Sequence, residues 1–255
     1  MLGIAKEKLF VKELNITKNR VSFRNELEDR RIYLGFKRIF DIVFSSLIIV
    51  FLLSWLLPLL AILIKIDSEG PVFFVQKRVG FLGRTFRCFK FRTMVVNAVC
   101  DHQQAVKNDP RITRLGKFLR ITSLDELPQF FNVLMGDMSI VGPRPHMHKD
   151  NEDFGRIVTN YRLRHYAKPG ITGMAQVKGY RGPAKNFHSI FHRYQWDAFY
   201  VRNANTSLDF KIIRLTAIQI VKSIFSFKSK EKKTENSIMI ENTPGLVFAK
   251  TVSPE

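Results

Sequence analysis

Cysteine is almost absent from this chain of 255 residues. The two cysteines, Cys88 and Cys100, lie too far apart in sequence for the close pair of a zinc knuckle. Two thiols are also too few for the framework of a small disulfide-stabilised secreted protein. We therefore expect both thiols to be reduced and to face a cytosol.

Acidic residues are scarce relative to basic ones. The chain has 22 Asp and Glu against 41 Lys and Arg, which gives a net charge of +19. A surplus of this size indicates an anionic partner, such as nucleic acid, acidic lipid headgroups or a polyphosphate substrate. Charge alone does not choose among these three.

Several functional motifs are missing as well. The glycines in segments 80–83 and 170–173 match neither the dinucleotide-binding spacing nor the P-loop, whose Lys-Ser/Thr ending is absent. No cysteine or third clustered ligand completes a zinc site around the histidines. No secretory signal is predicted, because the first apolar run follows a charged leader of roughly 36 residues. The closest approaches to a ligand spacing are the pairs His146 with His148 and His188 with His192.

A long apolar run from Phe40 to Ile64 is the strongest feature that is present. Its polar residues are Asp41 and three serines. A helix needs about 20 predominantly apolar residues to cross the hydrocarbon core of a bilayer. We expect residues 37–66 to form a membrane-embedded helix rather than a core helix of a soluble domain.

Pro58 interrupts this apolar run and predicts a kink, because proline removes a helix hydrogen bond and clashes with the preceding turn. Basic residues flank both ends, among them Lys37 and Lys65, and the positive-inside rule places such flanks in the cytoplasm. A re-entrant helix that dips into the membrane satisfies both flanks, with Ser54 as a hydrogen-bond partner for the freed backbone. A single tilted span with a proline kink stays open on these grounds.

The other segments predict an α+β protein that is mostly helical, with a small β element. Residues 1–36 read as a polar or amphipathic extension, 67–227 as the main folded domain and 228–255 as a mobile tail. Short strands are expected at 72–76 and 86–91, around a glycine loop. Helices are expected at 94–105, 124–135, 153–166, 187–201 and 208–227.

Two adjacent carboxylates, Asp125 and Glu126, stand at the expected start of one helix. In one interpretation Ser123 caps the helix and Glu126 closes a capping box, while Asp125 favours the positive end of the helix dipole. In the other, Asp125 is a nucleophile that forms an acyl phosphate and Glu126 helps to hold a divalent cation. The residues alone leave both interpretations open.

Phosphoryl chemistry also needs cations that neutralise the phosphates. Arg120 and Arg144 are candidates, the latter held between two prolines in Gly142-Pro143-Arg144-Pro145, and Lys90 and Arg92 form a third basic element. These side chains are the predicted phosphate-binding groups.

From residue 37 to about residue 216 the chain resembles the bacterial sugar transferase family, the monotopic phosphoglycosyl transferases that act on polyprenyl phosphate. The resemblance rests on ordered blocks spread along the whole catalytic region. The blocks are Lys37-Arg38-Ile39-Phe40-Asp41, Lys90-Phe91-Arg92-Thr93-Met94, Thr122-Ser123-Leu124-Asp125-Glu126-Leu127-Pro128-Gln129, Gly136-Asp137-Met138-Ser139-Ile140-Val141-Gly142-Pro143-Arg144-Pro145 and Lys168-Pro169-Gly170-Ile171-Thr172-Gly173.

This resemblance implies a compact enzyme of the bacterial inner membrane that works at the cytoplasmic face. It also implies that 67–227 is the catalytic domain, with interfacial helices and the small β element around a cytoplasmic active site. Asp125 would take a phosphosugar from a UDP-sugar, release UMP and pass the phosphosugar to undecaprenyl phosphate, with Mg²⁺ held by Asp125 and Glu126. Lys168 joins the phosphate-binding candidates, and the re-entrant helix is favoured over a span. Further positions that match the family motifs are Thr93, Gln129, Pro143, Pro145, Gln176 and Asp197.

The resemblance also bears on partners. Membrane lipids account for the basic charge, so nucleic acid is not expected, and the apolar membrane surface leaves a homodimer open. The alternative is a membrane-anchored basic binding or scaffold module without catalysis. Such a module has no use for the two adjacent carboxylates.

Overall fold

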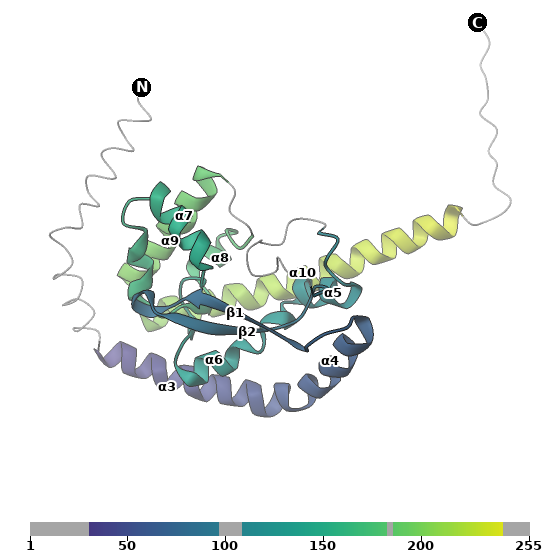
Figure 1. Cartoon of the computed structure of the whole chain (residues 1–255), viewed down its shortest axis with the longest axis horizontal. Helices are drawn as coiled ribbons and strands as arrows, with labels where there is room; N and C mark the ends of the chain where they lie inside the picture. The colour runs from purple at the N-terminus through teal and green to yellow at the C-terminus, as the bar shows by residue number, and fades with distance from the viewer. Residues whose placement is uncertain (1–30, 97–108, 183–185, 242–255) are drawn as a thin grey trace, which may run out of the picture.

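A computed structural model describes residues 31–96, 109–182 and 186–241, with only the backbone placed from 227 to 241. Helices dominate, and two small sheets pack among them (Figure 1). The helices are α3 (Arg31–Ile48), a π-helical segment (Ile49–Leu53), α4 (Ser54–Asp67), α5 (Arg114–Thr122), α6 (Gln129–Met135), α7 (His148–Ile157), α8 (Met174–Val177), α9 (Phe187–Asn203) and α10 (Thr206–Glu241), with 3₁₀ segments at Phe81–Gly83, Leu124–Glu126 and Tyr161–Tyr166. The strands are β1 (Phe73–Val79), β2 (Thr85–Phe91), β3 (Ser139–Val141) and β4 (Gly170–Thr172).

The long apolar helix predicted at residues 37–66 is present and begins earlier than expected. From Arg31 to Asp67 the chain forms 37 helical residues that are long and apolar enough to cross a membrane, and few of these side chains are buried inside the protein. Phe51 is 72% exposed and Ile66 is 78% exposed, which a soluble core helix would not show. The apolar face is therefore available to lipid.

The helix changes its hydrogen-bond pattern ahead of Pro58, in the π-helical segment, and α3 curves into α4 there (Figure 1). The Ser54 N–H donates to the carbonyl of Ile49, five residues back. The Ser54 hydroxyl donates to the Val50 carbonyl at 2.6 Å. Pro58 has no N–H for the carbonyl four residues earlier, which is that of Ser54 itself. The Ser54 hydroxyl does not pair with this carbonyl, because a serine hydroxyl in a helix reaches back by one turn, so the expectation that Ser54 partners the freed backbone is wrong.

Charged residues of α3 hold this helix against α6, α10 and β3. The Lys37 ammonium lies 2.7 Å from the Asp209 carboxylate at the start of α10. Arg38 donates to two carbonyls in the last turn of α6, at 2.6 and 2.8 Å, and the Asp41 carboxylate accepts the N–H of Ile140 in β3 at 3.0 Å. The basic residues before the apolar run, Lys37 and Arg38, therefore form a structural clamp between α3 and the elements α6 and α10.

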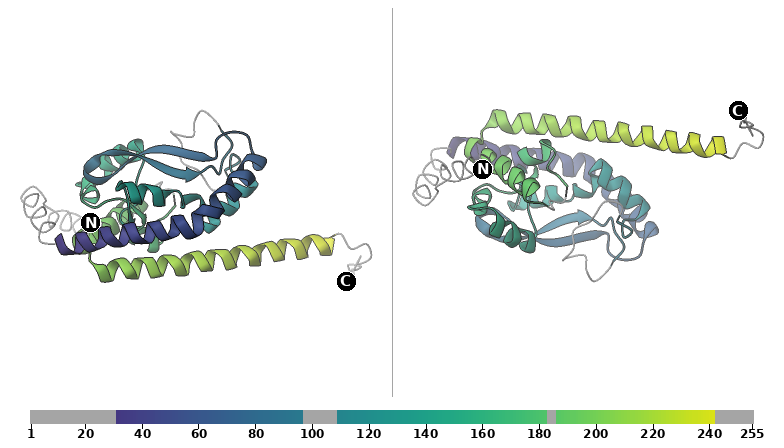
Figure 2. Two further views of the ribbon diagram at one scale, coloured as in Figure 1. Left: turned by 90° about the horizontal axis from the view of Figure 1, so that it is seen from below. Right: turned by 90° about the horizontal axis from the view of Figure 1, so that it is seen from above.

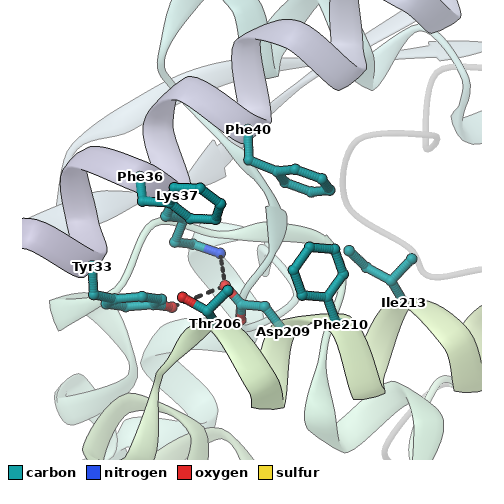
Figure 3. A pocket seen from close by; sticks show the side chains of 8 residues that line it. All are labelled: Tyr33, Phe36, Lys37, Phe40, Thr206, Asp209, Phe210 and Ile213. Carbon is teal, nitrogen blue, oxygen red and sulfur yellow. Dashed lines mark hydrogen bonds and ion pairs between the residues drawn. The ribbon is translucent and has the colours of Figure 1, made fainter.

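Figure 3 shows the α10 side of this clamp, where Tyr33 and Lys37 both point at Asp209. The Tyr33 hydroxyl donates to one carboxylate oxygen at 2.9 Å, and the Tyr200 hydroxyl donates to the other at 2.8 Å. We call Tyr33, Lys37, Tyr200 and Asp209 the α3–α10 joint. Both views in Figure 2 place α3 and α10 along one side of the molecule.

The two strands expected around the glycine loop are confirmed as the antiparallel hairpin β1–β2, in which Phe73 pairs with Phe91 and Val79 with Thr85. The parallel pair β3–β4 was not expected, because three-residue strands leave little alternation in the sequence. Gly142 and Gly170 permit this pairing. A Cβ on Gly142 would lie 2.1 Å from a backbone oxygen of the segment that leads into β4.

The expected helices at 187–201 and 208–227 are confirmed as α9 and α10, and α10 continues past residue 228 to Glu241. The helix expected at 94–105 does not start at Met94, which forms a β-bridge with Ile112 instead. Residues 97–108, like 1–30 and 242–255, lie outside the described part of the chain.

Two expected helices are each divided. The helix expected at 124–135 is wrong as a single element, since a 3₁₀ turn ends at Glu126 and α6 begins only after Pro128. Proline lacks the N–H that would continue the helix. The helix expected at 153–166 is likewise two elements, α7 and the 3₁₀ segment from Tyr161, because Asn160 between them has φ 63°. Turn chemistry overrode apolar periodicity at both places.

Candidate active site

The two carboxylates lie where α5 turns into a 3₁₀ segment. Ser123 ends α5 in the left-handed conformation, with φ 63° and ψ 16°, and the Glu126 N–H donates to its carbonyl. The turn directs Asp125 and Glu126 inward, and they are only 9% and 5% exposed. The Ser123 hydroxyl makes no capping hydrogen bond, so the capping-box interpretation is wrong: a left-handed residue cannot present its hydroxyl to the next turn.

Glu126 is surrounded by cations. Arg144 holds both carboxylate oxygens, at 2.5 and 3.3 Å, and Lys90 lies 2.9 Å from one of them. Arg181 reaches the other at 3.2 Å. Burial by itself would raise the pKa of Glu126, but Arg144, Lys90 and Arg181 together hold this pKa well below its usual range. Glu126 is therefore ionised and fixed.

Asp125 has a different environment. Among the residues that the structure describes, no side chain donates a hydrogen bond to its carboxylate, although Lys90, Arg120 and Arg144 are the nearest positive charges. Burial, and then the negative charge of Glu126, raises the pKa of Asp125 to about 6. A carboxylate that is buried, ionised near neutral pH and without donors is poised to react with an electrophile.

Arg144 owes its position to a second layer. Its backbone carbonyl accepts a hydrogen bond from Arg164 at 2.6 Å, and Arg164 pairs with Asp197 of α9 at 2.8 Å. Both members of that pair are almost fully buried. Pro143 and Pro145 stiffen the same loop on either side. Asp197, which sequence matching picked out without a role, thus helps to position Arg144 from α9 through Arg164.

Arg120 reaches the site from α5 and is oriented by Thr93. Its Nε donates to the Thr93 hydroxyl at 2.8 Å, and its charge acts on Asp125. Gly116, one turn earlier in α5, lies against the Thr93 backbone, where a Cβ would meet the carbonyl oxygen at 2.1 Å. This close approach fixes the distance between α5 and the end of β2.

Two of the predicted phosphate-binding residues lie elsewhere. The Arg92 guanidinium donates to the carbonyls of Ile64, Ser68 and Glu69 and so closes the C-terminal end of α4. Lys168 lies beside Gly136, close to Arg38 of α3, and a Cβ on Gly136 would be 3.7 Å from its Nζ. The structure does not bring either cation to the carboxylate pair.

Two glutamines from the predicted set are buried within the fold. Gln129 is 2% exposed and opens α6 directly after the carboxylate segment. The Gln176 amide donates to the Ile171 carbonyl at 3.1 Å, which ties α8 to β4. Both residues are therefore buried parts of the fold next to the site.

The described histidines lie in three separate places. Among the described residues no group of three or more His, Cys, Asp or Glu side chains is arranged to hold a metal ion. His146 is buried with its Nδ1 2.6 Å from the Tyr161 hydroxyl, and its pKa is well below its usual value because of burial and the neighbouring arginines. His188 and His192 do share a helix face, with their Nε2 atoms 2.9 Å apart.

Sequence reasoning missed Arg164 and Arg181 as members of this cluster. Arg164 lies in a basic run that reads as a solvated face, and only its burial against Asp197 reveals its role. Arg181 is flanked by Gly179 and Gly182, and an arginine between two glycines was the available signal for a loop residue that reaches a site.

Comparison with known proteins agrees with this geometry. The model of the bacterial sugar transferase family matches residues 32–223. The chain belongs to the bacterial sugar transferase family. Curated members include the UDP-glucose:undecaprenyl-phosphate glucose-1-phosphate transferase of Klebsiella pneumoniae, 49% identical over 189 residues that make up 74% of this chain and 40% of the relative.

Other relatives in the bacterial sugar transferase family carry different names. The exopolysaccharide production protein PSS of Rhizobium leguminosarum is 45% identical over 71% of this chain and 93% of the relative. An Aeromonas hydrophila relative, 43% identical over 71% of this chain and 43% of its own length, is named as a UDP-N-acetylgalactosamine-undecaprenyl-phosphate N-acetylgalactosaminephosphotransferase. The chain spans about two fifths of the length of the Klebsiella relative.

Proposed function

We propose that this protein is a phosphoglycosyl transferase that moves a sugar-1-phosphate from a UDP-sugar to a polyprenyl phosphate and releases UMP. The observation that carries the proposal is the contrast within one buried turn. Among the described residues no side chain pairs with Asp125, whose pKa is raised to about 6, and beside it three cations hold Glu126 ionised. The names of the relatives point to the same chemistry.

The reaction proceeds in two displacements in this proposal. An Asp125 oxygen forms a bond to the sugar-bearing phosphorus while the bond from that phosphorus to the bridging oxygen breaks, and the oxygen leaves with UMP. A phosphate oxygen of the polyprenyl phosphate then attacks the same phosphorus and frees the Asp125 carboxylate, which leaves a polyprenyl diphosphate sugar. Lys90, Arg120 and Arg144 neutralise the phosphate oxygens in both steps.

Magnesium fits this site as an ion that the protein and the substrate phosphates would hold together. Magnesium binds through one or two carboxylates together with substrate phosphates and water, and Asp125 with Glu126 supplies such a pair. When bound, the ion would neutralise charge on the diphosphate. Because protein cations cover both Glu126 oxygens, a metal ligand at Glu126 requires one of these cations to move.

We infer that the long apolar helix holds this site at the lipid surface, where a polyprenyl phosphate headgroup would lie. We infer a re-entrant helix with both flanks in the cytoplasm of a bacterial inner membrane, supported by the π-helical bend before Pro58. Single cysteines introduced at residues 32 and 66, in a variant with Cys88 and Cys100 replaced by serine, should both react with a membrane-impermeant thiol reagent only in inside-out vesicles. Opposite accessibility of the two flanks would instead establish a membrane-spanning helix.

The reaction is tested by UMP release from detergent-purified protein with magnesium, undecaprenyl phosphate and a panel of UDP-glucose, UDP-galactose and UDP-N-acetylgalactosamine. We expect one donor to give UMP and Asp125→Asn to reduce the rate at least about 1000-fold, because the amide cannot act as the nucleophile. Intact-mass analysis should detect the phosphosugar adduct on the wild type when the acceptor is omitted.

Asp153→Asn is the matched control, since Asp153 is an exposed aspartate of α7 that pairs with the surface residue Arg156. It should retain the wild-type rate. Equal rates for Asp125→Asn and the wild type would rule out the covalent mechanism. Absence of UMP from every donor would favour a membrane-anchored binding module.

A further inference from the structure

Arg181 is the least constrained of the cations on Glu126. It lies in the loop between α8 and α9, between Gly179, whose φ is 94°, and Gly182. A Cβ built on either glycine would have no other heavy atom within 4 Å, so space is open around the loop. The Arg181 side chain is 44% exposed, against 24% for Arg144 and 18% for Lys90.

The backbone on both sides of Arg181 is nevertheless held in place. The Tyr180 N–H donates to the Ala175 carbonyl at 3.0 Å, and the Tyr180 ring stacks on His192 of α9 with centroids 5.8 Å apart. The carbonyl of Gly182 accepts a hydrogen bond from Arg193. The base of the arginine is therefore fixed beside the site, while its side chain has room to move.

The contact that Arg181 makes is also the easiest to give up. Arg144 holds Glu126 through two nitrogen–oxygen contacts and is itself positioned by Arg164. Arg181 makes one contact, at 3.2 Å. A single, partly exposed ion pair contributes little, because solvent screens it. Glu126 stays fixed by Arg144 and Lys90 if Arg181 leaves.

The charges of the site call for such a movement. Lys90, Arg120, Arg144 and Arg181 face the two carboxylates, so the site carries more positive than negative charge. A nucleoside diphosphate sugar brings two negative charges on its phosphates. Arginine matches phosphate oxygens with its planar fork of donors, which Glu126 engages here at only one point.

We infer that Arg181 is a donor-binding residue that moves from Glu126 to the diphosphate of the incoming nucleotide sugar. This inference rests on the proposed function, because it assigns the ligand of the same site. In the protein without donor, Arg181 occupies one oxygen of Glu126. When the donor enters, the side chain turns to a phosphate oxygen and leaves that carboxylate oxygen to Arg144.

The inference is tested by the binding of UDP, which carries the diphosphate of every donor in the panel, measured by calorimetry without divalent metal. Arg181→Gln should weaken UDP binding roughly 10- to 100-fold, the usual loss for a charge-assisted hydrogen bond to phosphate. Arg181→Lys should recover part of the affinity, because it keeps the charge and loses the fork. Arg156→Gln, which changes an exposed arginine of α7, should bind UDP like the wild type.

Steady-state kinetics separate binding from a merely structural role. Arg181→Gln should raise the donor KM by a similar factor and leave its melting temperature and its KM for undecaprenyl phosphate unchanged. Equal UDP affinity for Arg181→Gln and the wild type would overturn the inference, as would a loss accompanied by unfolding in both Arg181 variants. If the wild type binds UDP but releases no UMP from any donor, the proposed reaction fails, and the UDP comparison still decides the role of Arg181.

Discussion

The α3–α10 joint and the carboxylate pair are two buried charge clusters built by opposite rules. In the joint, Asp209 receives one cation and two hydroxyl donors, so both of its oxygens are satisfied. At the candidate active site, Glu126 has three cations while Asp125 has no described donor. A buried carboxylate whose oxygens all have donors stabilises a fold. A buried carboxylate without donors has a raised pKa and is available to react with a substrate.

The contrast between the two clusters is tested most strongly by removing the carboxylate of Asp209 from the α3–α10 joint. Asp209→Asn should lower the free energy of unfolding by about 2–4 kcal/mol, because it leaves the largely buried Lys37 ammonium without its counter-charge. Thermal unfolding in detergent measures this as a fall in melting temperature. The same substitution at the exposed Asp153 should change the free energy of unfolding by less than about 0.5 kcal/mol. Equal melting temperatures for the two variants would show that the joint does not hold α10.

The same change of aspartate to asparagine at Asp125 should alter the free energy of unfolding in the opposite direction. Asp125→Asn should raise the free energy of unfolding at pH 7.5 by about 2 kcal/mol, because an ionised, buried Asp125 destabilises the folded state. Melting temperatures of the variant and the wild type are compared between pH 3.5 and 8.

The sign of this effect follows from the raised pKa. Protonated Asp125 contributes stability that is fully present below the unfolded pKa of 3.8 and is lost as the pH rises through about 6. The stability gap between Asp125→Asn and the wild type should therefore open between these values and close below pH 4. A gap that does not change with pH would mean that Asp125 is not destabilised by burial.

Much of the framework could be read from the sequence. The apolar run predicted the membrane helix, the alternation around a glycine loop predicted β1 and β2, and the ordered motifs indicated the family and the adjacent carboxylates. These features are local, so neighbouring residues alone carry the signal. The break between Glu126 and Gln129 was missed although Pro128 marked it, because apolar periodicity was given more weight than turn chemistry.

The membership of the cation cluster could not be read in the same way. Arg92 and Lys90 are two residues apart, yet Lys90 pairs with Glu126 and Arg92 closes the end of α4. Residues two apart in a strand point to the same face, so Lys90 and Arg92 would be expected to lie together. They separate because β2 ends at Phe91 and the chain takes another path from Arg92 onward. Arg181, 55 residues beyond Glu126, reaches it nonetheless.

The sequence by itself determined that this protein has a lipid-facing helix, a basic surface and a pair of adjacent acids in a family-specific setting. Composition and short-range order are enough for these properties, because each depends on residues that are close in the chain. Only the tertiary structure decided that Asp125 is buried with no donor among the described residues and that Glu126 is held by Lys90, Arg144 and Arg181. Burial and long-range charge contacts set the pKa values, and both exist only once distant segments pack together.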